Sequence, residues 1–147
     1  MPRAELAVSH LPYQGVNLVI VSARIDDANV HYRLVLDTGA NYCTLLPEHV
    51  AALDLTELPI PRSLVGVGPV TDPSIRLYLA KRVLLRSVTG PTVGFEGSSR
   101  VSGILFGVEE RVRRIGADGV LGMDFLQRFN QLDIDPQTPR VAVVWNS

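Results

Sequence analysis

Short runs of β-branched and aliphatic residues, separated by turn-forming residues, recur along most of the chain. Residues 16–25 form one such run, residues 26–29 have the composition of a turn, and residues 30–36 form the next run. Runs of this length and composition predict β-strands joined by tight turns. Further strands are expected at 60–67, 70–79, 83–88, 103–108 and 141–145. The pattern therefore predicts an all-β fold.

Two segments have a helical pattern, and both are short. Residues 47–53 begin with Pro47, and Glu48 follows it, a composition typical of a first helical turn. Residues 123–129 form the second segment. So little helix argues against a helical bundle and against a fold of alternating strands and helices. With 147 residues, the chain is expected to form a single domain over 1–147.

The charge distribution argues against several classes of partner. The formal net charge is −1, and the basic residues are scattered except for Arg111, Arg113 and Arg114, which we interpret as a solvated face. A basic footprint for nucleic acid or for a membrane surface is therefore missing.

Cys43 is the single cysteine, so no intrachain disulfide can form. Residues 1–15 lack the basic and apolar regions of a signal peptide, and a cytoplasmic protein is expected.

An apolar run, residues 34–36, leads directly into Asp37, Thr38 and Gly39. Such a run is expected to place the carboxylate among apolar neighbours, where it needs hydrogen-bond donors, a charge partner or a shared proton. Thr38 can supply a hydroxyl group, and Gly39 lets backbone amides approach closely. The alternative interpretation is an aspartate that caps an ordinary turn at the end of a strand.

Three segments together resemble those of one family of enzymes. Residues 37–40 resemble the active-site motif of the aspartic peptidases, and an apolar strand precedes the motif as it does in that family. Residues 118–126 resemble the hydrophobic-hydrophobic-Gly segment and short helix that lie late in each lobe of these enzymes. The glycine-tipped stretch 66–69 lies between them, where the family carries its substrate-covering flap. The resemblance implies a closed acid-protease barrel of the retropepsin-like kind, with one or two short helices and a flap hairpin.

The chain carries one Asp-Thr-Gly motif, whereas pepsin-like enzymes carry two such motifs in one long chain. The chemistry of the family uses two carboxylates about 3 Å apart that share one proton. The resemblance therefore implies a homodimer in which each chain contributes Asp37 to a dyad on the two-fold axis. In the mechanism that the resemblance implies, a water molecule held between the two carboxylates attacks a peptide bond of the substrate, and neither a metal nor another cofactor is expected.

The resemblance also assigns the residues of the site. The expected catalytic residues are Asp37, Thr38 and Gly39, with Thr38 reaching across to the partner loop. Contacts with a peptide or protein substrate are expected from Ala40, Asn41, Gly66, Val67, Gly68, Val120 and Leu121. Residues 141–145 are a weaker candidate for part of the dimer contact, because apolar terminal strands invite pairing.

Two positions depart from the pattern of the retroviral enzymes. Those enzymes form an ion pair between an acidic residue two positions after the motif's glycine and an arginine directly after the late glycine. Here Asn41 and Met123 occupy these positions, so the dimer contact is expected to differ. Asp124 matches an acidic residue common in cellular and bacterial relatives, and the chain resembles that type. Two alternatives keep the fold: a non-catalytic dimeric module that binds peptides or serves as a scaffold, and a heterodimer whose second motif lies in another chain.

Overall fold

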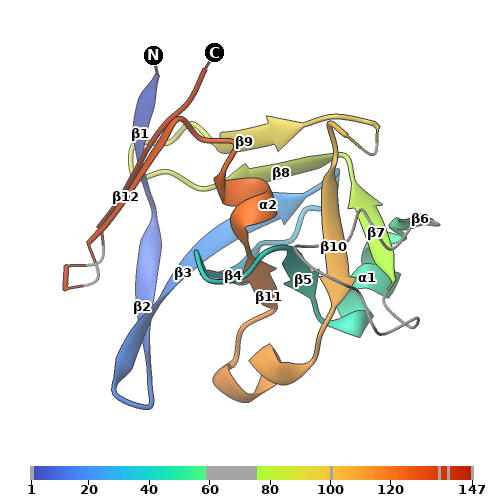
Figure 1. Ribbon diagram of the computed structural model, residues 1–147, viewed down its shortest axis with the longest axis horizontal. Helices are drawn as coiled ribbons and strands as arrows, with labels where there is room; N and C mark the ends of the chain where they lie inside the picture. The colour runs from blue at the N-terminus through green and yellow to red at the C-terminus, as the bar shows by residue number, and fades with distance from the viewer. Residues whose placement is uncertain (1, 59–75, 100, 136, 139, 147) are drawn as a thin grey trace.

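The computed structural model describes residues 2–58, 76–99, 101–135, 137–138 and 140–146, and most of them form β-strands (Figure 1). The strands are β1 (Arg3–Leu6), β2 (Val8–Tyr13), β3 (Val16–Ile25), β4 (Tyr32–Leu36), β5 (Cys43–Leu45), β6 (Thr56–Leu58), β7 (Leu77–Ala80), β8 (Arg82–Leu85), β9 (Val93–Glu96), β10 (Ile104–Val108), β11 (Gly119–Leu121), β12 (Gln131–Asp135) and β13 (Arg140–Val144). The helices are α1 (Pro47–Leu53), α2 (Met123–Leu126) and the 3₁₀ helix η2 (Arg111–Ile115). The all-β prediction is confirmed.

The strands form two sheets. The larger sheet has the order β6-β7-β10-β5-β11-β4-β3-β8-β9, and β2 pairs with β3 outside this path. Most neighbours are antiparallel, but β11 runs parallel to β4, and β10 runs parallel to β5. The smaller sheet has the order β1-β13-β12. The larger sheet curls into a half-barrel, with α2 packed over its centre (Figure 1).

Side chains on both faces of β4 are buried. Leu34 and Leu36 point into the main core, which also contains the fully buried rings of Phe106 and Phe125. Val35 points to the opposite face and belongs to a smaller cluster made of Ile20, Val35, Leu46, Val112 and Ala117. This division follows from the alternation of side chains along a strand. The smaller cluster covers the face of the sheet on which the cavity described below lies.

Several element boundaries agree with the sequence prediction, and others shift. Strand β3 and helix α1 begin and end where they were predicted. Strand β4 begins two residues later than predicted, and Val30 lies outside it with 52% of its surface exposed. Helix α2 ends at Leu126 instead of residue 129, because the next amides bond to carbonyls three residues back, Arg128 N to Phe125 O and Phe129 N to Leu126 O.

Several observed strands lie outside the predicted runs, among them β1, β2, β5, β6, β9 and β12. Strands β1 and β2 precede the first predicted strand, and β12 lies between the last helix and the last strand. Strand β12 does carry a period-two signal, because Leu132 and Ile134 are half-buried while the residues between and beside them are exposed. The strands predicted at 60–67 and 70–79 meet at the 66–69 hairpin, which lies outside the described residues. Among the described residues, β6 and β7 lie on either side of residues 59–75 and pair with each other.

The C-terminal strand β13 is the central strand of the smaller sheet. Arg3 of β1 pairs with Val144 on one side, and Gln131 of β12 pairs with the same residue on the other side. The two ends of the chain therefore lie next to each other (Figure 1). Both edges of β13 are therefore occupied within one chain, and a part for residues 141–145 in the dimer contact stays a prediction.

Candidate active site

Asp37 lies in a loop that β4 and β11 position together. Strand β11 runs parallel to β4, with Gly119 opposite Leu34 and Leu121 opposite Leu36. The register continues past the end of β4, where the amide of Asp37 donates a 3.0 Å hydrogen bond to the carbonyl of Leu121. The loop also closes on itself through a 3.3 Å bond from the amide of Ala40 to the carbonyl of Asp37. The backbone of the motif is thus fixed relative to the sheet.

A second pair of backbone hydrogen bonds attaches this loop to the start of α2. The amide of Met123 donates to the carbonyl of Ala40 at 2.8 Å, and the amide of Asp124 donates to the carbonyl of Asn41 at 2.9 Å. Positions 41 and 123 are those at which retroviral enzymes place an ion pair. In this protein main-chain bonds join the two segments at the same point.

Gly122 allows the loop and helix α2 to come this close. A Cβ atom at this position would lie 2.5 Å from the carbonyl oxygen of Tyr42 and 2.9 Å from that of Ala40. Both distances are far shorter than a real carbon–oxygen contact, and both neighbours are backbone atoms that cannot rotate away. Gly122 therefore gives the Asp37 loop its room beside α2.

The carboxylate of Asp37 is exposed in the single chain. Its Oδ1 atom accepts a 2.8 Å hydrogen bond from the amide of Gly39, and Thr38 is exposed beside it. The expectation that apolar neighbours would bury this carboxylate is therefore wrong for one chain. The apolar run places the strand in the core, and the turn after Leu36 carries the acid to the surface. An exposed carboxylate is free to meet a partner across an interface.

A cavity of about 550 Å³ opens beside Asp37. Four of the predicted site residues line it: Asp37, Ala40, Asn41 and Val120. Leu121 does not line it, because alternation along β11 turns its side chain into the main core, where it is fully buried. Gly66, Val67 and Gly68 lie outside the described residues, so the predicted flap is described no further. The substrate contacts remain predictions.

Most of the cavity wall comes from residues that the sequence analysis did not single out. Leu18, Val112 and Ile115 add apolar surface, and the remaining lining residues are Tyr13, Val35, Tyr42, Thr44, Glu109 and Arg111. Tyr13 and Leu18 belong to the β2–β3 hairpin. Val112 and Ile115 lie three residues apart in a stretch that otherwise reads as charged. That spacing places both side chains on one face of η2. It was the sequence signal that could have indicated an apolar face in this segment.

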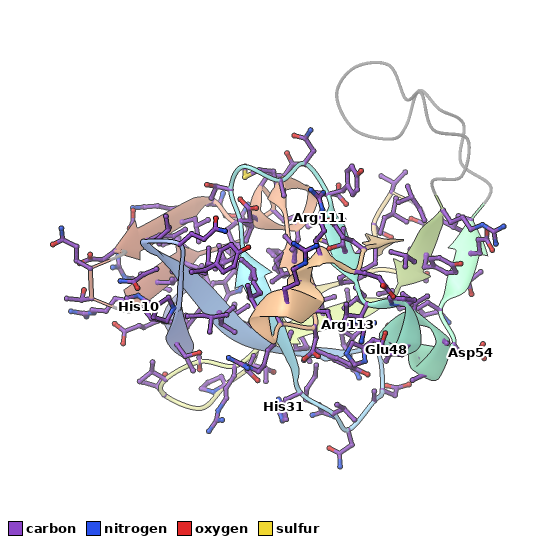
Figure 2. The ribbon with its side chains drawn as sticks, turned by 90° about the horizontal axis from the view of Figure 1, so that it is seen from below. His10, His31, Glu48, Asp54, Arg111 and Arg113 are labelled. Carbon is purple, nitrogen blue, oxygen red and sulfur yellow. The ribbon has the colours of Figure 1, made fainter. Side chains whose placement is uncertain are left out.

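The segment that contains η2 is attached to α1 by an ion pair. Arg113 donates two hydrogen bonds to Glu48, from Nη1 to Oε2 at 2.5 Å and from Nη2 to Oε1 at 2.7 Å (Figure 2). The Arg113 guanidinium lowers the pKa of Glu48 to about 2. Arg111 lies on the same segment and bonds to Glu109 at the cavity. The basic cluster is exposed as predicted, but it also supports one wall of the cavity.

A second contact holds the start of β11. His49 Nε2 lies 2.8 Å from Asp118 Oδ1, and Asp118 Oδ2 accepts a 2.8 Å hydrogen bond from the amide of Arg33 on β4. The rings of Tyr32 and His49 pack edge to face, with centroids 5.0 Å apart. Burial, and then the charge of Asp118, raise the pKa of Tyr32. These contacts fix β11 against β4 just before Val120 and Gly122.

The described residues offer neither a metal-binding cluster nor a reactive thiol. Among the residues that the structure describes, no group of three or more His, Cys, Asp or Glu side chains is arranged to hold a metal ion. Cys43 is fully buried, and burial raises the pKa of its thiol to about 12, so the thiol stays protonated and packs as an apolar group. In the same described ranges, no helix is long and apolar enough to cross a membrane.

The fold is similar to that of a solved enzyme. The crystal structure of a retropepsin-like aspartic protease from Rickettsia conorii matches with a TM-score of 0.56 and 16% sequence identity, over 99% of this chain and 93% of that one. Neither a scan against protein-family models nor a search of curated proteins found a match. At this identity the likeness shows the fold. The half-barrel of this protein is therefore retropepsin-like.

Proposed function

We propose that this protein is a homodimeric aspartic endopeptidase that hydrolyses peptide bonds with a water activated by Asp37 of each chain. One observation carries the proposal: a carboxylate held by the amide of Gly39 lies exposed at the mouth of a cavity with apolar walls. A cavity that combines apolar walls with polar groups able to fix orientation suits a peptide side chain. A carboxylate at its edge suits the activation of a water molecule.

The proposal requires a second carboxylate, and a second copy of the chain supplies it. Two carboxylates about 3 Å apart cannot both ionise, so they share one proton. The ionised Asp37 accepts a proton from the bound water, and its protonated counterpart polarises the carbonyl of the scissile bond. Because Asp37 and Thr38 are exposed in one chain, pairing about a two-fold axis can bring them against their counterparts without unfolding either chain.

The neighbouring residues have supporting roles in this proposal. Gly39 holds one carboxylate oxygen through its amide, which leaves the other oxygen for the water. Thr38 contacts the partner loop. Ala40, Asn41 and Val120 line the cavity and contact the substrate. No metal or cofactor takes part in the proposed reaction.

Specific activity is expected to depend on protein concentration. One chain carries half of the proposed site, so the activity per chain should fall when the protein is diluted below the dissociation constant of the dimer. The measurement is cleavage of an unstructured protein across a dilution series, with sedimentation equilibrium at the same concentrations. A strictly monomeric protein whose specific activity is constant on dilution would contradict the half-site arrangement.

The pH dependence of cleavage is expected to follow a bell. Two carboxylates that share a proton titrate as a coupled pair, and the singly ionised pair is the active state. Activity should therefore rise as the first proton leaves and collapse as the second leaves, with an acidic to mildly acidic optimum. The measurement is kcat/KM from low to alkaline pH, with circular dichroism confirming that the fold persists. A profile that keeps rising into the alkaline range would rule out this chemistry.

A further inference from the structure

Thr44 occupies an unusual position in the wall of the cavity beside Asp37. Neighbouring strands β4, β11 and β5 place Val35, Val120 and Thr44 directly beside one another, since Val120 pairs with Val35 on one side and with Thr44 on the other. All three residues line the cavity. The row thus presents two apolar side chains and then one hydroxyl-bearing side chain to the same space.

The hydroxyl group of Thr44 is buried without a hydrogen-bond partner. The residue is 6% exposed, and its Oγ1 has no partner among the described residues. Ser87 offers a comparison, since it is also a buried polar residue at 4% exposure. Its Oγ donates a 2.5 Å hydrogen bond to the carbonyl of Pro91. The protein therefore satisfies the Ser87 hydroxyl group internally and leaves the Thr44 hydroxyl group without a partner among the described residues.

An unsatisfied buried hydroxyl group destabilises a folded chain, and most buried polar groups are paired. Valine has almost the same shape as threonine and would fill this place beside Val35 and Val120 without that penalty. The packing of the chain therefore does not explain a hydroxyl group at this position. A bound molecule that enters the cavity and exchanges a hydrogen bond with Thr44 Oγ1 would explain it.

We propose that Thr44 is a specificity-determining residue of the cavity and selects an uncharged polar side chain, such as that of Asn or Gln, in a peptide substrate. The inference rests on the peptidase function proposed above. The aliphatic part of the substrate side chain packs on Val35 and Val120, and its amide exchanges a hydrogen bond with Thr44 Oγ1. Asp37, Glu109 and Arg111 also line the cavity, so the preference assigned to Thr44 is for an amide over an aliphatic side chain, which the test below compares.

The first test compares wild type with Thr44→Val and Thr44→Ser. Substrates are peptides in which each position around the cleaved bond carries Asn or Leu in turn. At one position, Thr44→Val should lower the kcat/KM ratio of the Asn to the Leu peptide roughly 5- to 150-fold, the range expected when a buried polar group loses its partner. Thr44→Ser keeps the hydroxyl group and should keep the preference. An unchanged ratio at every position overturns the inference.

A second measurement separates this inference from the proposed function. If wild type cleaves none of the peptides, the peptidase proposal fails, and binding of the same peptides by calorimetry then tests Thr44 alone. Weaker binding of an Asn peptide to Thr44→Val than to wild type supports the inference. Equal binding, or no binding of any peptide, overturns it.

Thermal unfolding of the unliganded variants distinguishes a binding role of the Thr44 hydroxyl group from a structural one. The two roles predict opposite shifts of the unfolding midpoint. Removing an unpaired hydroxyl group should raise the unfolding midpoint of Thr44→Val by about 2–4 °C for a chain of this size. A hydroxyl group that stabilises the fold through an internal bond would instead lower the midpoint when removed, and that result would also overturn the inference.

Discussion

Replacing Asp37 with Asn is expected to abolish cleavage, lowering kcat/KM by at least roughly 10²- to 10⁴-fold, the contribution of a positioned acid or base. Asn has the shape of Asp and can still accept the 2.8 Å hydrogen bond from the amide of Gly39. It cannot accept a proton from water. Because Asp37 is exposed in the single chain, the substitution leaves no buried charge unpaired, and the fold should persist. The measurement combines peptide cleavage with circular dichroism.

A matched control is Asp133→Asn, which makes the same chemical change at an exposed position on β12 and should leave activity unchanged. Mixing wild type with excess Asp37→Asn chains should suppress wild-type activity, because mixed dimers hold only one carboxylate. No suppression would favour a heterodimer with a different partner chain. Wild-type activity in Asp37→Asn itself would refute catalysis by this residue, and peptide binding without cleavage in wild type would favour the binding module.

Replacing Gly122 with Ala is expected to destabilise the protein strongly, by roughly 3 kcal/mol, the upper part of the usual range for overpacking. The added Cβ would lie 2.5 Å from the carbonyl oxygen of Tyr42 and 2.9 Å from that of Ala40. Relief requires the Asp37 loop to move away from α2, which breaks the bond from the amide of Met123 to the carbonyl of Ala40. Stability and activity should therefore fall together.

Gly107→Ala is the matched control for that substitution. Gly107 is also buried, but a Cβ there would meet the Tyr42 ring at 3.5 Å and the carbonyl of Cys43 at 3.8 Å, which are ordinary contacts. Urea unfolding of both variants measures the difference. Equal unfolding midpoints for the two variants would show that the loop yields easily at Gly122 and that its close approach to α2 is not required.

The parts of the fold that the sequence predicted depend on local pattern. Strand β3 and helix α1 have strong short-range signals, and their boundaries agree with the structure. The Asp37 loop and Gly122 were identified from motif order, and the structure places them together. Their pairing depends on the register of β11 against β4, which no local pattern specifies.

What the sequence did not reveal depends on contacts between distant segments. Strand β12 carries a period-two pattern over only five residues, and that pattern does not specify its pairing with β13. The wall of the cavity joins the β2–β3 hairpin, β5 and η2, which are far apart along the chain. The resemblance assigned both Val120 and Leu121 to the substrate. The alternation of side chains along β11 sends the two residues to opposite faces.

The small terminal sheet bears on how such an enzyme would be switched on. Strands β1, β13 and β12 join both ends of the chain within one copy, so a chain needs no strand from a partner to complete this sheet. Folding should then be a first-order process, with a refolding rate independent of protein concentration. Recovery of activity should instead be second order, since it waits for two finished chains to meet. Local abundance of the chain would thus control the activity of the proposed dimer.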